Sequence, residues 1–296
     1  MIRNLLERYR NVLLVVGAVG LGVAVPAFGP TLKPLVTPLV IFLVFGSLRG
    51  LRPRELDVSS YAVLIVLSLG ISYVVLPVGG IRLARLAFED GAVVGFAIAL
   101  SVPTTAGSAI IWTRFARGDV QLATTASIVS LLVAPVATPI VLSRLVGSRA
   151  AVPVGSILTD LAIIVGGGAL LAVVVPSDAL SSRTVDRGAT LAVLLLIYTS
   201  VAGVGTGDVT GRHAVSVVGL SVLLVAFGLC VSALCERGFG LPRVRTIPLF
   251  FTSSLKNLGI ALLIALAYAD PIVVFSIITY YVVQQLSGAV IADTIA

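Results

Sequence analysis

Ten apolar runs, each of roughly 17 to 27 residues, fill this chain, and only short charged or turn-forming gaps separate them. A helix needs about 20 apolar residues to cross a bilayer. The runs lack the alternation of a membrane β-barrel, so helices are the structure that satisfies their backbone groups in lipid. We therefore predict an all-α polytopic membrane protein with ten transmembrane helices, at roughly 11–28, 32–48, 60–84, 91–117, 119–145, 152–175, 184–204, 213–235, 244–269 and 271–293.

The composition excludes a soluble enzyme. Of the 296 residues, 58% are hydrophobic and 11% charged, against roughly 45–50% and about 25% in soluble domains. A soluble fold must cover its surface with charge, and the mean hydropathy here is +1.14. The net charge of +7 does not indicate nucleic acid, because the cations lie in the gaps and not on one domain face. The expected partner is the lipid bilayer, with no nucleic acid and no second, soluble domain.

The basic residues also predict the topology. With the N-terminus inside, 13 of the 20 Lys and Arg residues fall in the inner gaps and 6 in the outer gaps. This asymmetry favours a multi-pass protein of the plasma membrane with both termini in the cytoplasm. Because nine more apolar runs follow the first, we expect residues 1–10 to form an amphipathic lead-in and 11–28 to form the first span, not a cleaved signal peptide.

Two polar interruptions indicate an internal repeat. The stretch SVPTTAGS at 101–108 lies in the fourth span, and a shift of about 150 residues places FTSSLKNL at 251–258 in the ninth. Five spans per half is an odd number, so the second half would enter the membrane inverted relative to the first. We predict two inverted five-helix repeats, 1–150 and 151–296, with discontinuous fourth and ninth helices that cross.

A broken helix leaves backbone groups without partners. Pro103 removes a donor and Gly107 relaxes the chain, so one half-helix exposes carbonyls that can hold a cation and the next exposes N–H groups that can hold an anion. The simpler alternative is a pair of Pro-kinked helices with small residues for close packing. Interruption at matching places in both halves favours a binding site, lined by Thr104, Thr105, Ser108, Thr252, Ser253, Ser254 and Asn257.

Lys256 is the twentieth cation, and it lies within a predicted span. It is about 12 residues into that span, roughly 18 Å along a helix, which places it at mid-membrane. An ionisable residue there is a functional candidate, although a lysine can also reach back to an interface. Asp160 is also ionisable and within a span, and its role is left open. The two cysteines, Cys230 and Cys235, lack CxxC spacing and are expected to be buried small hydrophobes.

The two interrupted regions resemble a known family, the bile acid:sodium symporters of the bile-acid and arsenite transporter group. The similarity lies in VPTTAGSAIIWTRFARGDVQLATTASIVSLLVAPVATP at 102–139 and in TSSLKNLGIALLIALAYADPIVVFSIITYYVVQQLSGAVIA at 252–292. The resemblance implies a panel domain of helices 1, 2, 6 and 7 and a core domain of helices 3–5 and 8–10. It further implies two sodium ions beside the helix crossing and an amphipathic organic anion in the cavity between the domains.

The sodium ligands that the resemblance implies are only partly retained. The glutamate that serves both sodium ions in the family falls on Thr252, and the fourth-helix asparagine falls on Ala109 or Ile110. Of two hydroxyl ligands from the fifth helix, one falls on Ala123 and the other on Ser127. The expected sodium sites are therefore eroded.

Other family positions carry informative residues. The third-helix glutamine falls near Ser72, and the ninth-helix glutamine is replaced by Lys256, so we infer that the lysine ammonium takes the place of the second sodium ion. The asparagine that faces substrate in the family is Asn257, and the polar pair of the last helix is Gln284 and Gln285.

We thus predict a secondary active transporter of a small or amphipathic organic anion, working by alternating access. It would be proton-coupled or uncoupled, with Na⁺ still open, and without a cofactor or a firm metal site. The alternatives are a conventional sodium symporter and an arsenite exporter, although no cysteine precedes Cys230 to supply a thiolate on the broken fourth helix. An enzyme would need a nucleophile with a base or a metal cluster, which the spans lack. The predicted substrate residues are Thr104, Thr105, Ser108, Asn257, Gln284 and Gln285, and the predicted cation-site residues are Ser72, Ser108, Ser127, Thr252, Ser253 and Lys256.

Overall fold

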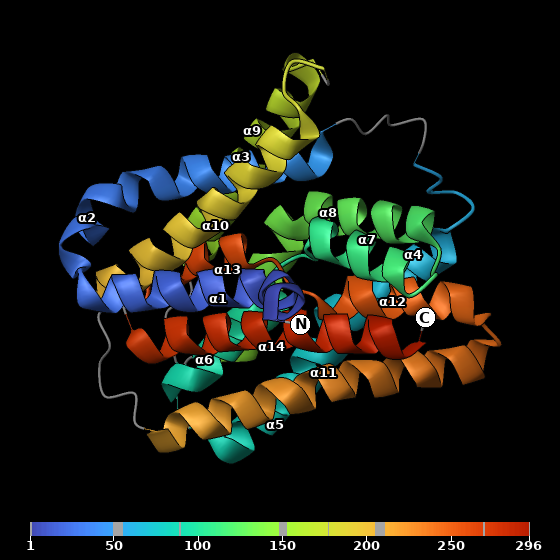
Figure 1. Cartoon of the computed structure of the whole chain (residues 1–296). Helices are drawn as coiled ribbons and strands as arrows, with labels where there is room; N and C mark the ends of the chain where they lie inside the picture. Colours follow the sequence, from blue (N-terminus) through green and yellow to red (C-terminus); the bar gives the residue numbers. More distant parts are fainter. Residues whose placement is uncertain are drawn as a thin grey trace.

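Helices form nearly all of this computed structural model, which describes residues 2–49, 56–88, 90–147, 153–176, 178–204, 211–268 and 270–295 (Figure 1). The described residues form no strand, and their one isolated β-bridge joins Thr104 and Lys256. In chain order the elements are α1 (Ile2–Ala24), η1 (Pro26–Phe28), α2 (Gly29–Leu32), η2 (Lys33–Leu35), α3 (Val36–Leu48), α4 (Ala62–Gly70), η4 (Ile71–Val75), α5 (Leu76–Ala87), α6 (Asp90–Ser101), α7 (Ala106–Phe115), α8 (Val120–Val146), α9 (Val154–Val174), α10 (Ser182–Val204), α11 (Gly211–Phe239), α12 (Arg243–Ser254), α13 (Leu258–Ala265) and α14 (Pro271–Ile295).

Seven helical segments are long and apolar enough to cross a membrane. They are Pro26–Leu48, Ala62–Ala87, Val120–Val146, Val154–Val174, Ser182–Gly203, Ala214–Phe239 and Pro271–Ile295. The three other predicted spans correspond to α1 and to the interrupted pairs α6–α7 and α12–α13. The chain is therefore a multi-pass membrane protein, as predicted, whereas its division into two inverted repeats stays a prediction.

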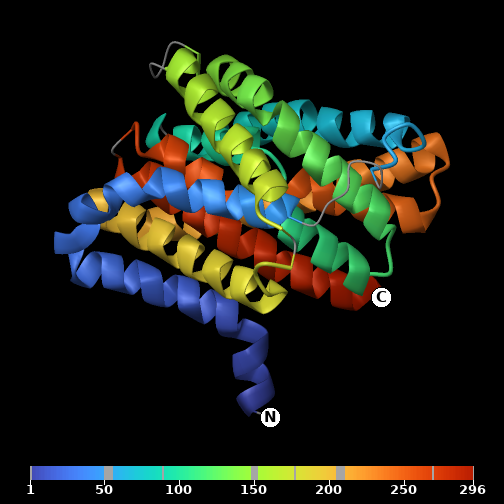
Figure 2. The same ribbon diagram turned by 90° about the horizontal axis from the view of Figure 1, so that it is seen from above.

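The helices pack in two groups, which are joined where α8 packs against α9. α3 packs against α9 and α10, and α1 packs along α10. The other group is built around α14, which packs against α6 and α11, while α12 packs against α4, α7, α8 and α11. Figure 2 shows α1 in dark blue beside α10 in yellow along one side of the molecule. The first group contains the spans that the family resemblance assigns to a panel domain.

The turn between α7 and α8 carries the RGD stretch of the sequence. Asp119 caps α8 by accepting a hydrogen bond from the Leu122 backbone N–H at 3.0 Å, and its other carboxylate oxygen accepts one from the Tyr61 hydroxyl at 2.8 Å. Arg117 adopts a positive φ of 59° in this turn. An aspartate is among the best N-cap residues, so this motif residue has a structural role in starting α8 and holding the segment before α4.

Close packing in the second group depends on small residues. Gly95 in α6 faces α14 so closely that an added Cβ would lie 2.8 Å from the Val273 carbonyl oxygen. Phe96 and Tyr280, the neighbouring aromatic pair, are fully buried with ring centroids 6.4 Å apart. α6 is therefore fixed against α14, and its C-terminal end has a defined position.

Candidate functional site

The two interrupted helices meet at their breaks. α6 and α12 both stop, the chain runs extended for a few residues, and α7 and α13 then begin. The extended segments pair antiparallel: the Thr105 N–H donates to the Leu255 carbonyl at 3.0 Å, and the Asn257 N–H donates to the Pro103 carbonyl at 2.9 Å. Both breaks are present as predicted, and the pairing holds four half-helix ends together.

The C-terminal ends of α6 and α12 lie on one side of this crossing, and donors of the protein occupy their carbonyl groups. The Ser101 carbonyl accepts from the Thr138 hydroxyl at 2.9 Å, and the Ser254 carbonyl accepts from the Tyr280 hydroxyl at 3.1 Å. The Thr252 carbonyl accepts from the Thr104 hydroxyl. A bound cation would therefore compete with existing hydrogen bonds for these oxygens.

Lys256 projects into the same side of the crossing, and its side chain is 2% exposed. Its Nζ donates to the Ser72 hydroxyl at 2.7 Å, to the Ser72 carbonyl at 2.8 Å and to the Val102 carbonyl at 3.4 Å. It also lies 5.4 Å from the centroid of the Tyr73 ring, within the range of a cation–π contact. All three hydrogen-bond acceptors are neutral oxygens, which is the ligand chemistry of a monovalent cation.

A π-helical turn explains why the Ser72 carbonyl is free to accept from a lysine. In η4 the Leu76 N–H reaches back five residues to the Ile71 carbonyl. The next donor in that pattern, which would serve Ser72, is the nitrogen of Pro77, and proline has no N–H. Single π-turns occur frequently at functional sites. Pro77, inside the third predicted span, is the sequence signal for this turn.

The backbone of Lys256 is held by Gln284 of α14. The Gln284 side chain accepts from the Lys256 N–H at 2.9 Å and donates to the Lys256 carbonyl at 2.9 Å. The neighbouring Gln285 has different partners, because its amide donates to the Ser108 hydroxyl at 2.9 Å and accepts from the Trp112 indole at 3.2 Å. The polar pair of the last helix thus connects to both breaks.

The remaining hydroxyls of the predicted cation site do not form a cradle for sodium. The Thr252 and Ser253 hydroxyls both donate to carbonyls of their own helix at 2.8 Å, and Thr252 also pairs with the Ser68 hydroxyl. Ser127 is fully buried and its hydroxyl has no hydrogen-bond partner among the described residues. With Thr252 at the family's glutamate position and an ammonium at the glutamine position, these residues do not fit two sodium ions.

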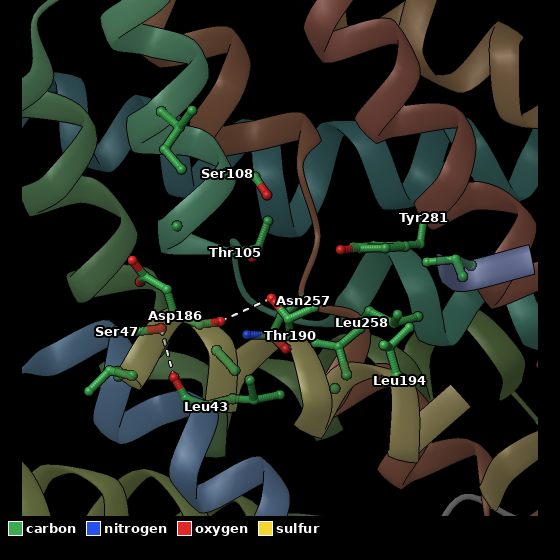
Figure 3. Close-up of a pocket in the computed structure, with 18 of the residues that line it drawn as sticks. Leu43, Ser47, Thr105, Ser108, Asp186, Thr190, Leu194, Asn257, Leu258 and Tyr281 are labelled. Atoms are coloured by element: carbon green, nitrogen blue, oxygen red, sulfur yellow. Dashed lines mark hydrogen bonds between the residues drawn. The ribbon is translucent and has the colours of Figure 1, made fainter. Parts of the chain in front are cut away.

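A cavity of about 450 Å³ lies on the other side of the crossing. One wall comes from α1, α3 and α10, and the facing wall comes from α7, α13 and α14 (Figure 3). The first residues of α7 and α13 lie in it, so the N-terminal ends of two half-helices open into the cavity. Its lining residues are Leu14, Val15, Leu43, Gly46, Ser47, Thr105, Gly107, Ser108, Ile111, Val185, Asp186, Ala189, Thr190, Val193, Leu194, Asn257, Leu258, Gly259 and Tyr281.

The crossing divides the predicted residues into two sets. Thr105, Ser108 and Asn257 line the cavity. The side chain of Asn257 also caps α13 by accepting from the Ile260 N–H at 3.2 Å. The second set is buried and consists of Ser72, Thr104, Ser127, Thr252, Ser253, Ser254, Lys256 and Gln284. Of the predicted substrate residues, Thr104, Gln284 and Gln285 do not line the cavity. Their roles in transport stay predictions.

The wall formed by α1, α3 and α10 supplies residues that we missed. Asp186 and Thr190 lie one turn apart on α10 and both line the cavity (Figure 3), and the Thr190 hydroxyl donates to the Asp186 carbonyl at 2.9 Å. Asp186 lies near the start of a predicted span, and in the structure it is exposed as well as lining the cavity. Only the packing of α10 against the second helix group gives it a cavity to face.

Three residues outside this region have simpler explanations. Asp160 is exposed on α9 and does not line the cavity. Cys235 is partly buried, but Cys230 is exposed, so the prediction that both cysteines are buried was wrong. The physical reason is that α11 presents many exposed apolar side chains, among them Val222 and Leu234, and so turns one face outward.

Two crossed, interrupted helices beside a cavity define a class, because helix breaks that meet at a polar site are the typical architecture of secondary transporters. The sequence matches the SBF-like CPA transporter family over residues 11–296. Since this match covers nearly the whole chain, the protein belongs to that family and is a membrane transporter. The chain matches no curated protein sequence.

Proposed function

We propose that the protein is a secondary active transporter of an organic anion in which Lys256 takes the place of a sodium ion. One observation carries this proposal: a buried ammonium donates to neutral oxygens of Ser72 and Val102, at the C-terminal end of α6. A charged group at mid-membrane costs several kcal/mol unless it is paired with polar groups or serves a function. The negative ends of half-helices are where a cation is favourable.

The anion belongs on the opposite side of the crossing. The N-terminal ends of α7 and α13 open into the cavity and carry partial positive charge. Asn257 and Ser108 supply polar atoms there, next to apolar residues such as Leu194. A cavity of about 450 Å³ with this lining suits a small organic anion with an apolar body.

Coupling follows from the chemistry of the lysine. The Lys256 ammonium is part of the chain, so it cannot cross the membrane with the substrate as a sodium ion does. It can release its proton, so transport is either proton-coupled or uncoupled, and it needs no sodium. Loss of the proton would weaken the contacts of Lys256 with Ser72 and Val102. Because these residues belong to two different spans, the protonation state of Lys256 can bias how the spans pack.

Alternating access would follow from motion of one helix group against the other. The cavity lies between α1, α3 and α10 on one side and α7, α13 and α14 on the other, so rocking of these walls would open it to either face of the membrane. The distribution of basic residues supports a plasma-membrane protein with both termini in the cytoplasm. Reporter fusions at each terminus test that orientation.

The test is uptake of a panel of radiolabelled organic acids into proteoliposomes with imposed proton gradients. We expect uptake of at least one monocarboxylate, driven or accelerated by the proton gradient or indifferent to it, without added sodium. Strict dependence on sodium would contradict the replacement of sodium by Lys256. Arsenite transport has little support, because neither cysteine lines the cavity.

A further inference from the structure

Asp186 gives the cavity a charge that a simple anion carrier would not need. Among the cavity-lining residues that the structure describes, Asp186 is the one whose side chain is charged at neutral pH, and none of these described residues is a lysine or an arginine. Arg183 and Arg187, the nearest basic residues along α10, are exposed as Asp186 is, but unlike Asp186 they do not line the cavity. A carboxylate at this position repels a purely anionic ligand and attracts a cationic group.

The polar groups of the cavity are spread along α10. Asp186 and Ser47 lie together at one end, Tyr281 and Leu194 lie toward the other, and Asn257 lies between them near Thr190 (Figure 3). Thr190 is one helical turn from Asp186, about 6 Å along the axis, and Leu194 is two turns away, about 12 Å. The cavity therefore has an acidic end, a polar middle and an apolar end.

We propose that the substrate is a zwitterion whose ammonium group binds at Asp186 while its carboxylate binds near Asn257. This assignment rests on the proposed binding of a substrate carboxylate at the N-terminal ends of α7 and α13, and it adds that the substrate also carries an ammonium group. The carbon chain of the substrate sets the spacing between its two charged groups.

Charge pairing at Asp186 also lowers the energetic cost of placing the substrate in a cavity within the membrane. A zwitterion carries no net charge into the membrane; its ammonium meets the Asp186 carboxylate, and its carboxylate meets the partial positive charge at the N-terminal ends of α7 and α13. The ammonium is supplied by the substrate, so Asp186 needs no inorganic cation. An inorganic cation at Asp186 is the competing source of the same charge, and the experiment separates the two.

The experiment measures ligand binding to the purified, full-length protein by isothermal titration calorimetry. Matched ligand pairs isolate the ammonium group: butanoate against 4-aminobutanoate, hexanoate against 6-aminohexanoate, and octanoate against 8-aminooctanoate. We expect at least one amino compound to bind about ten- to a hundredfold more tightly than its matched alkanoate, the range for one hydrogen bond between charged groups. Asp186→Asn should abolish that preference.

The control variant is Asp160→Asn, which removes an exposed aspartate on α9 outside the cavity. It should retain the full preference for the amino compound. Equal binding of both members of every pair would overturn the zwitterion assignment and leave the proposed anion transport intact. If sodium strengthens alkanoate binding in the wild type and not in Asp186→Asn, Asp186 holds an inorganic cation and the assignment is likewise wrong. If the protein neither binds nor transports alkanoates or amino compounds, the proposed function is wrong as well.

Discussion

The two sides of the helix crossing are chemically opposite. On the side of the α6 and α12 C-termini, every named carbonyl accepts a hydrogen bond from the protein, and the Lys256 ammonium lies in a buried pocket of neutral oxygens. On the side of the α7 and α13 N-termini there is a cavity of about 450 Å³. Thr105, which precedes α7, makes no side-chain capping hydrogen bond.

This contrast indicates that the two sides of the crossing bind different ligands. Helix breaks create a place for a cation and a place for an anion at the same point. In this chain the Lys256 side chain occupies the cation site, and the anion site is an open cavity. Only the anion therefore has to bind from solution. The variants below test each side separately, beginning with the largest expected effect.

Lys256→Ala should have the largest effect. It leaves the Ser72 and Val102 oxygens buried without a donor, at about 1–3 kcal/mol for each unsatisfied group. We expect loss of uptake by at least about a hundredfold and a lower melting temperature. The control is Lys33→Ala, because Lys33 is exposed and is the other lysine of the chain. Retained uptake in Lys256→Ala would refute a functional role for the ammonium.

Gln284→Ala should have the second largest effect, because it removes two hydrogen bonds from the buried backbone of Lys256. We expect a loss of about 2–4 kcal/mol in the free energy of unfolding, from two unsatisfied groups. Its neighbour provides a matched control: Gln285→Ala removes contacts with Ser108 and Trp112, which are partly exposed. Gln285→Ala should cost about 1 kcal/mol or less, and equal destabilisation of the two variants, measured by thermal or chemical denaturation, would be the contrary result.

Asn257 tests the open side, because its side chain both caps α13 and lines the cavity. Asn257→Ala should destabilise the protein by about 1 kcal/mol through loss of the cap. Asn257→Asp keeps a capping oxygen but adds a negative charge where we place the substrate carboxylate. We expect Asn257→Asp to preserve the melting temperature and to weaken ligand binding by at least about tenfold, as calorimetry would measure. Undiminished binding in Asn257→Asp would place the carboxylate elsewhere.

Gly107→Ala should have the smallest effect on stability. An added Cβ meets nothing within 4 Å, and alanine favours a helix over glycine by up to about 1 kcal/mol. The methyl group would instead occupy the cavity, so ligand affinity should fall by a few-fold while the melting temperature holds or rises. Gly95→Ala is the opposite case, since its Cβ would collide with the Val273 backbone and should lower the melting temperature. Similar behaviour of both variants would mean that the cavity side is as tightly packed as the core.

Much of the fold could be predicted because apolar length and helix-breaking residues are local signals. The ten runs, and the breaks at Pro103 and near Lys256, needed no knowledge of neighbours. The π-turn and its link to Pro77 required the pairing of the third and ninth spans, which a single sequence does not specify. Asp186 was missed for the same reason, since its exposure to a cavity depends on how α10 packs against α7 and α13. Cys230 was misjudged because the periphery of a membrane bundle is apolar too.

The most direct test of the central claim is the sodium dependence of uptake by the wild-type protein. Proteoliposomes are assayed at constant pH and ionic strength with sodium replaced by choline on both sides of the membrane, using an organic acid that the protein accepts. If the Lys256 ammonium is the resident cation, the rate of uptake in choline equals the rate in sodium. A fall in uptake to the background of protein-free vesicles when sodium is removed would show that a mobile sodium ion is required and would contradict the role of Lys256.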